Sequence, residues 1–256
     1  MKPLIRIMPY LALSLLFIGN IEAMEIVRDD AVSASRMFSP KSYNELPSVE
    51  DASQRLSDNG NLSLFLTEGI KIAEKHGLDD IAGVRLVHRH FDAAVDECIV
   101  ESNIVDDEGI ALITKAEKIE LSHDAKPASW IRTERGFEVF EFSRDPAVRS
   151  AHEGNLINET FLLELDQAII KYGLSGIITP SIMKRKWDHS YDPNTFIFLE
   201  KTKKSASVVR PVQNDSHSDK AIRTGWPLAS EEKEQVCITY CDADSGGHAV
   251  AYHGVA

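Results

Sequence analysis

Two histidines separated by a single residue are the first candidates for chemistry in this chain of 256 residues. His88 and His90 follow the apolar run Val84–Val87, which is typical of a β-strand. On a strand, residues two apart share one face and lie about 6.6 Å apart along the chain. Two imidazoles at that spacing can bind one metal ion, and zinc-type ions favour imidazole nitrogen. The pair therefore predicts a metal site, and the alternative is two histidines that only form hydrogen bonds.

Acidic side chains follow the two histidines closely. They are Asp92, Asp96, Glu97 and Glu101. One carboxylate could orient a metal-binding imidazole through its second nitrogen, and another could act as a general base. With water on an open position of the metal ion, this set predicts a metal-dependent, zinc-type hydrolase.

The C-terminal tail contains a second candidate site, formed by two thiols and two imidazoles. Three residues separate Cys237 from Cys241, six separate Cys241 from His248, and four separate His248 from His253. Two cysteines and two histidines are a ligand set of structural zinc sites, but the middle interval is much shorter than in zinc fingers. The tail is therefore interpreted as a metal site, a disulfide or a pair of inert thiols.

The third cysteine, Cys98, affects the choice between a disulfide and the other two interpretations of the tail. If residues 236–241 are extended, Cys237 and Cys241 lie about 13 Å apart and cannot bridge each other, which makes Cys98 the natural disulfide partner of one of them. A joint metal centre, in which tail residues meet His88 and His90, is a further possibility.

The segment Gly83–Phe91, followed by Glu97 and Val100-Glu101, resembles a segment of a protein group with many fungal members. In that group a glycine-led apolar run carries a His-Arg-His-Phe core and then an acidic Val-Glu end. The resemblance covers residues 83–101 of this chain. The group has no assigned activity, so the resemblance implies only that the two histidines are more than incidental.

The N-terminus has the order of a secretory signal peptide. Lys2 and Arg6 precede the apolar run Leu11–Ile18, and Ala23 precedes Met24. The apolar run is shorter than the ~20 residues that span a bilayer. We expect residues 1–23 to be cleaved and the mature protein to be secreted or periplasmic; the alternative is an uncleaved membrane anchor.

The net charge and the absence of common catalytic motifs reduce the number of function classes that fit this sequence. The formal net charge of -12 argues against general binding of nucleic acid or of anionic lipid. The chain has no nucleophile elbow, phosphate-binding loop or His-Glu-X-X-His motif. We expect an exported binding or effector-like protein with a protein or small-molecule partner and no membrane span after cleavage; the alternative is the hydrolase that uses His88 and His90.

Hydrophobic periodicity predicts the elements that position these residues. Apolar stripes at helical spacing predict helices over 61–76 and 161–172, each ended by a glycine. These two units are interpreted as ordinary capped helices or as an internal duplication. Strands are predicted at 84–88, 98–101, 130–133, 137–142, 177–179, 196–199 and 207–209. The resulting fold class is α+β, a mixed or mainly antiparallel sheet packed with two or more amphipathic helices. The predicted organisation is a polar, mostly irregular arm over 24–60, a main domain over 61–212, and a linker and tail over 213–256.

Overall fold

The computed structural model of the protein describes residues 38–134, 136–183, 185, 191–192, 195–203, 205–213, 221–229 and 239–242. The predicted signal peptide over 1–23 lies outside these residues, as do Cys237, His248 and His253. None of the helices in the described ranges is long and apolar enough to cross a membrane.

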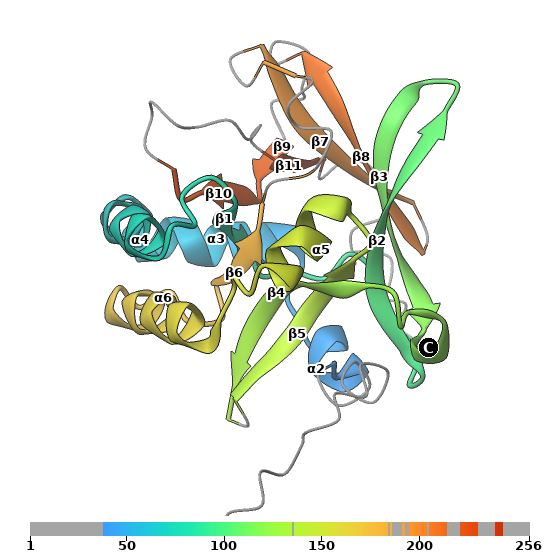
Figure 1. The fold of residues 1–256 in the computed structure, drawn as a ribbon. Helices are drawn as coiled ribbons and strands as arrows, with labels where there is room; N and C mark the ends of the chain where they lie inside the picture. The colour runs from blue at the N-terminus through green and yellow to red at the C-terminus, as the bar shows by residue number, and fades with distance from the viewer. Residues whose placement is uncertain are drawn as a thin grey trace, which may run out of the picture.

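One mixed sheet of eleven strands dominates the described fold (Figure 1). The strands are β1 (Ala82–Leu86), β2 (Glu97–Asp106), β3 (Gly109–Lys118), β4 (Lys126–Thr133), β5 (Gly136–Ser143), β6 (Ile178–Ile182), β7 (Phe196–Lys203), β8 (Ala206–Gln213), β9 (Ala221–Arg223), β10 (Gly225–Pro227) and β11 (Thr239–Asp242). Their order in the sheet is β10-β1-β6-β4-β5-β2-β3-β8-β7-β11-β9. Most neighbours are antiparallel, whereas β5 with β2 and β7 with β11 are parallel.

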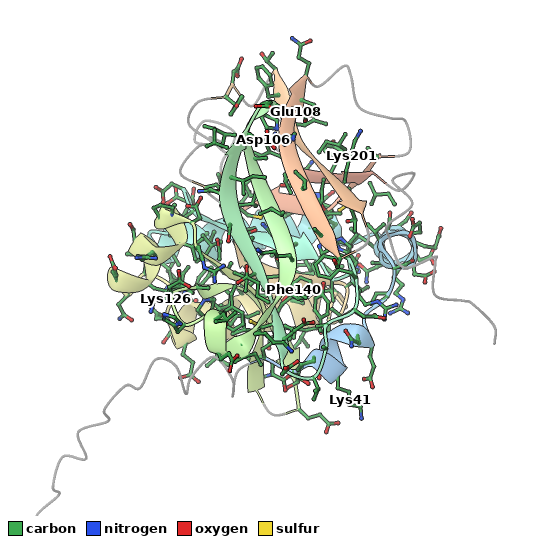
Figure 2. The ribbon with its side chains drawn as sticks, turned by 90° about the vertical axis from the view of Figure 1, so that its right-hand side faces the viewer. Lys41, Asp106, Glu108, Lys126, Phe140 and Lys201 are labelled. Carbon is green, nitrogen blue, oxygen red and sulfur yellow. The ribbon has the colours of Figure 1, made fainter. Side chains whose placement is uncertain are left out.

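The predicted α+β class is wrong, because the sheet curls into a nearly closed, barrel-like fold that outweighs the helices. The fold class is predicted wrongly mainly because hydrophobic periodicity does not reveal all of the strands. The sequence of β3 contains Ala, Lys and Glu, which have low strand propensity. Its pairing with β2 nevertheless runs without interruption from Glu97↔Lys118 to Asp106↔Gly109. The resulting hairpin carries Asp106 and Glu108 at its outer tip (Figure 2).

Five α-helices flank the sheet in the described residues: α2 (Pro40–Asn44), α3 (Val49–Asn59), α4 (Leu62–His76), α5 (Pro146–Glu153) and α6 (Glu159–Lys171). A short 3-10 helix, η1, spans Ile119–Leu121. The two helices predicted from periodicity are confirmed as α4 and α6, which lie side by side (Figure 1). Gly77 ends α4 with a φ of 65°, the left-handed conformation that glycine adopts without steric cost.

The predicted irregular arm is wrong where the structure describes it, because residues 40–59 form α2 and α3. The hydroxyls of Ser39 and Ser48 accept hydrogen bonds from backbone N–H groups and cap these two helices. Tyr43 and Val49 are buried in the main core. At the other end of the chain, β9 and β11 belong to the same sheet as the rest of the fold.

The hydrophobic core has two parts. The larger part lies between the helices and one face of the sheet and includes Phe65 of α4, Leu165 of α6 and Val84 of β1. The smaller part consists of Leu112, Phe198 and Val209 from β3, β7 and β8. These three side chains also line a cavity inside the curved sheet.

Candidate metal centre

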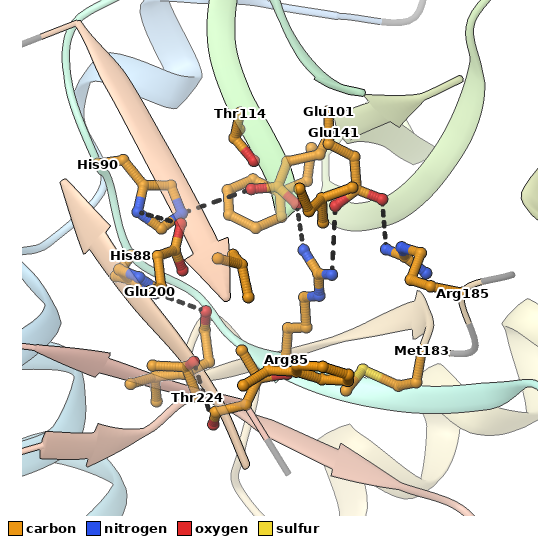
Figure 3. Close-up of a pocket in the computed structure, with 16 residues that line it drawn as sticks. Arg85, His88, His90, Glu101, Thr114, Glu141, Met183, Arg185, Glu200 and Thr224 are labelled. Atoms are coloured by element: carbon orange, nitrogen blue, oxygen red, sulfur yellow. Dashed lines mark hydrogen bonds and ion pairs between the residues drawn. The ribbon is translucent and has the colours of Figure 1, made fainter. Parts of the chain in front are cut away.

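The cavity inside the curved sheet is walled by charged side chains from four strands (Figure 3). Arg85 comes from β1, Glu101 from β2, Glu141 from β5 and Glu200 from β7. Arg185, which follows β6, completes the charged wall. About 30 Å³ of the cavity is open to water-sized molecules, the space of roughly two waters.

His88 and His90 lie beside this cavity but not on a strand. β1 ends at Leu86, two residues earlier than the extended run predicts. The segment that follows remains tied to its neighbours, since Val87 N–H donates to the Ile177 carbonyl. Both imidazoles are buried, with 4% and 3% of each residue exposed, and their ring centroids lie 4.5 Å apart. The two rings therefore face the same interior space, although the segment that carries them is not a strand as predicted.

Four potential metal ligands meet at this point. His88, His90, Glu200 and Cys241 are all buried, and one donor atom from each lies within 4.8 Å of the others. Cys241 Sγ lies 3.4 Å from His88 Nε2 and 3.1 Å from Glu200 Oε2. His90 Nδ1 lies 3.5 Å from Glu200 Oε1. Donors at zinc bond lengths around a tetrahedral ion are about 3.3–3.8 Å apart. The three separations lie near this range, and the set as a whole spreads to 4.8 Å, so a bound ion would draw the donors slightly closer together.

Each histidine also has a partner for its second ring nitrogen. His88 Nδ1 lies 2.9 Å from the Leu86 carbonyl oxygen. Because a carbonyl oxygen only accepts, Nδ1 carries the proton and the lone pair of Nε2 faces Cys241. His90 Nε2 lies 3.5 Å from Glu141 Oε1, which leaves Nδ1 directed at Glu200. Metal-bound histidines show the same pattern, with the distal nitrogen held by a carbonyl or a carboxylate.

The charges of the cavity favour a cation. Two guanidinium groups, of Arg85 and Arg185, face three carboxylates, of Glu101, Glu141 and Glu200, which leaves one negative charge in excess. Arg85 Nη1 lies 2.6 Å from Glu141 Oε2, and Arg185 Nη2 lies 2.5 Å from Glu101 Oε1. Glu200 is not part of either of these two arginine pairs, and it is the carboxylate that lies beside the two histidines and Cys241.

The protonation states of the cluster follow from this arrangement. Burial acts against a charged Glu200, but His90 and the hydrogen bond from Ser207 outweigh it and lower the pKa of Glu200 to about 2. Burial likewise acts against a charged His90, and the carboxylates of Glu200 and Glu141 outweigh it and raise the pKa of His90. Burial and the Glu200 carboxylate raise the pKa of the Cys241 thiol well above its usual range. Glu200 is thus an anion that attracts either protons or a metal ion to its neighbours.

The same atoms offer a thiol nucleophile next to a base, since His88 Nε2 lies 3.4 Å from Cys241 Sγ. A nucleophilic cysteine needs surroundings that stabilise its thiolate. Glu200 is 3.1 Å from Sγ and does the opposite. The geometry therefore supports a metal ligand better than a nucleophile.

The structure brings together three of the residues that the sequence singles out, His88, His90 and Cys241. Among the predicted carboxylates, Asp92 instead pairs with Arg89, and Asp96 pairs with Lys118. Glu101 lines the cavity on the arginine side.

Four residues of the site have no place in the sequence prediction: Arg85, Glu141, Arg185 and Glu200. The available signal is a carboxylate inside an apolar strand, such as Glu200 after the run Phe196–Leu199. A buried charge of this kind requires a partner, and it is therefore a marker of function.

The cysteines are unbridged in the described part of the chain. Cys98 and Cys241 are both buried free thiols, so the predicted disulfide between Cys98 and this tail cysteine is wrong. The Cys98 thiol instead donates to Ser122 Oγ at 3.2 Å. Cys237 lies outside the described residues.

Comparison of the chain with protein-family models, with curated proteins and with solved structures found no match. Function is therefore argued from the donor set. Imidazole and thiol donors suit zinc and related transition metals, whereas calcium and magnesium require oxygen ligands. The mixed set of two imidazoles, one thiol and one carboxylate consequently points away from an alkaline-earth ion.

Proposed function

We propose that this protein binds one zinc-type transition metal ion through His88, His90, Glu200 and Cys241. The single observation that carries the proposal is the convergence of these four buried donors within 4.8 Å. Protein side chains fill all four positions of a tetrahedral ion, which is the pattern of closed, structural zinc sites. The function is therefore metal binding that holds the fold together, in a protein that we propose is exported.

The position of the ligands in the chain supports a structural role. Glu200 lies on β7 and Cys241 on β11, a parallel pair in which these two residues are register partners. The two histidines come from the segment that follows β1. A bound ion would thus tie β11, a strand of only four residues, to its neighbour β7 and to the segment after β1, a strand near the other end of the sheet order. A strand this short gains much of its stability from such a link.

The second candidate is the metal-dependent hydrolase that uses His88 and His90. If Cys241 remains a neutral thiol, its neighbours form a His-His-Glu set, the ligand set of several zinc hydrolases, with a fourth position left for water. The raised pKa of the Cys241 thiol and the small space beside the cluster favour this alternative. The decisive difference between the two candidates is whether Cys241 binds the ion.

Metal content tests the proposal directly. The full-length protein would be purified from the exporting host without chelator, and its metals measured by plasma mass spectrometry. We expect about one zinc-type ion per chain, and loss of that ion in the variant His88→Ala/His90→Ala. The matched control is His152→Ala, which removes a histidine on α5 outside the cluster. Full metal content in the double variant, or no uptake of Zn²⁺ by the wild type, would contradict the proposal.

A further inference from the structure

A single buried carboxylate connects the candidate metal centre to the arginine side of the cavity. Glu141 has a side chain that is 2% exposed, and its two oxygens face different partners. Oε1 lies 3.5 Å from His90 Nε2, and Oε2 lies 2.6 Å from Arg85 Nη1 (Figure 3). The three groups form a chain from guanidinium to carboxylate to imidazole.

This chain fixes which nitrogen of His90 is available. Glu141 forms an ion pair with Arg85, with 2.6 Å between Oε2 and Nη1, and the carboxylate is the anion of this pair. An ionised carboxylate only accepts hydrogen bonds, so His90 Nε2 must carry a proton. Nδ1, which lies 3.5 Å from Glu200 Oε1, also faces a carboxylate, but it is the nitrogen on the side of the cluster. A metal ion bound there would replace the proton of Nδ1, while Nε2 keeps its proton toward Glu141.

The other histidine depends on the backbone for the same purpose. His88 Nδ1 donates to the Leu86 carbonyl, a contact that no side-chain substitution at position 86 removes. Glu141 is therefore the side chain through which the sequence controls imidazole orientation at this centre. Arg85 holds the second oxygen of Glu141 and prevents the carboxylate from turning away from His90.

The free-energy cost of burying the Arg85–Glu141 ion pair indicates that the pair has a role at the candidate metal centre. Buried ion pairs are often no more stabilising than apolar side chains of similar volume. Arg85 also keeps one buried nitrogen, Nε, without a hydrogen-bond partner among the described residues. Burying the Arg85–Glu141 pair costs free energy, and Glu141 contacts the candidate ligand His90. The effect of the pair on His90 is therefore the better explanation for its presence.

We infer that Glu141 is a positioning residue for the metal ion, holding His90 in the tautomer and orientation in which Nδ1 binds. The inference rests on the proposed function. Carboxylates in this position raise the basicity of the imidazole, and their loss costs metal proteins about 10- to 100-fold in affinity.

The test compares Glu141→Gln with Glu138→Gln in the full-length protein. Glutamine nearly matches the shape of glutamate but has one donor end and one acceptor end. If the amide oxygen faces Arg85, the NH₂ group faces His90 and forces the wrong tautomer; if it faces His90, the NH₂ group faces the guanidinium. Glu138 is the matched control, because it is a second buried carboxylate of β5 that accepts a hydrogen bond from Thr133 Oγ1 and lies outside the lining of this cavity.

Zinc affinity would be measured by competition with a chromophoric chelator, and the His90 tautomer by nitrogen NMR of ¹⁵N-histidine. We expect Glu141→Gln to weaken Zn²⁺ binding about 10- to 100-fold and to shift the His90 signal, with Glu138→Gln within about threefold of wild type. Equal affinity in Glu141→Gln and wild type, or equal loss in both variants, would overturn the inference. If Glu141→Gln does not fold, Glu141→Met replaces it, because methionine has a similar length and no carboxylate. Wild-type Zn²⁺ affinity in that variant would likewise overturn the inference.

Failure of the inference differs from failure of the proposed function. A wild-type protein that takes up no Zn²⁺ rejects the metal centre itself. A wild type that binds Zn²⁺ while Glu141→Gln binds equally well rejects only the role of Glu141.

Discussion

Cys241 and Glu200 are register partners on the parallel strands β11 and β7, with Sγ of the first 3.1 Å from Oε2 of the second. Burial makes ionisation of the thiol unfavourable, and a carboxylate at this distance adds to the effect, so both raise the pKa of Cys241. A cation placed between the two groups reverses this effect, because it attracts both anions. Cys241 beside Glu200 is consequently poorly suited to act as a nucleophile, whereas the two residues together are well suited to bind a metal ion.

The first prediction concerns Cys241. In the closed four-ligand centre, Cys241→Ser removes one donor, and we expect Zn²⁺ affinity to fall by more than about 100-fold, beyond the loss typical of a change outside the ligands. With Co²⁺ in place of Zn²⁺, the wild type should show thiolate-to-cobalt charge-transfer absorption and the variant should not.

Cys98→Ser is the matched control for this experiment, since it alters a second buried free thiol that bonds to Ser122. We expect it to leave cobalt absorption unchanged. If Cys241→Ser keeps wild-type affinity for Zn²⁺, the His-His-Glu arrangement with an open position is correct instead, and hydrolase activity becomes the property to assay.

The second prediction concerns removal of the metal. An ion bound by folded protein alone stabilises it by about 2.7 kcal/mol when free metal is 100 times the dissociation constant. We expect a chelator to lower the free energy of unfolding by this order. Amide hydrogen exchange should accelerate in β11, which the ion would tie to His88 and His90.

The comparison region for hydrogen exchange is the β2–β3 hairpin, whose ten register pairs lie outside the ligand set. Its central amides should exchange at the same rate with and without metal. Equal exchange of β11 in the two states would show that the ion does not hold this strand.

The sequence predicts local structure well in this protein. α4 and α6 are found because their apolar residues recur at helical spacing and a glycine ends each pattern. The β4–β5 hairpin is found because two strand-like runs flank a short loop with Gly136. The histidine pair is found because two residues of metal-binding type stand close together.

Long-range assembly is the part that the sequence pattern misses. His88 and Cys241 are 153 residues apart in the chain but in contact in space, and periodicity carries no information on that distance. Glu141 and Glu200 lie on strands that an apolar pattern predicts. That pattern predicts each strand but gives no role to a charged residue in it. The barrel-like closure is missed because β3 and the three-residue strands β9 and β10 depend on their partners rather than on strand propensity.

The third prediction concerns pH and a histidine outside the candidate centre. Burial and nearby Lys126 lower the pKa of His152, against the opposing effect of its hydrogen bond to the Pro127 carbonyl at 2.7 Å. The unfolded chain, with a histidine pKa of about 6.5, therefore binds more protons than the folded protein as the pH falls below that value. The stability that depends on neutral His152 is complete above this pH and decreases as the pH falls toward the lowered value.

Urea unfolding between pH 5 and 8 measures this contribution. The free energy of unfolding of wild type should fall more steeply with acid than that of His152→Gln. His123→Gln is the control, because His123 is exposed before β4, and its slope should equal that of wild type. Parallel slopes for wild type and His152→Gln would contradict the assignment.

The fourth prediction concerns Gly83, which opens the segment with the two histidines. β1 lies between β10 and β6, and Gly83 is opposite Pro227 and Ser181. A Cβ atom here would lie 2.7 Å from the Trp226 carbonyl oxygen and 2.0 Å from Met183 Cγ. The methionine side chain can move, but the carbonyl belongs to the backbone of β10. We expect Gly83→Ala to destabilise the fold by about 1–3 kcal/mol, the usual cost of overpacking.

Gly69→Ala gives the matched comparison, because its new Cβ would meet the end of the Leu228 side chain at 2.8 Å rather than backbone. A helix interior also favours alanine over glycine by about 1 kcal/mol, which offsets part of the contact. Urea unfolding should therefore show a clearly larger loss for Gly83→Ala than for Gly69→Ala. Because β1 leads directly into His88, Gly83→Ala should also weaken Zn²⁺ binding, whereas Gly69→Ala should not. Equal stability of Gly83→Ala and wild type would mean that β10 is not packed against β1 at this point.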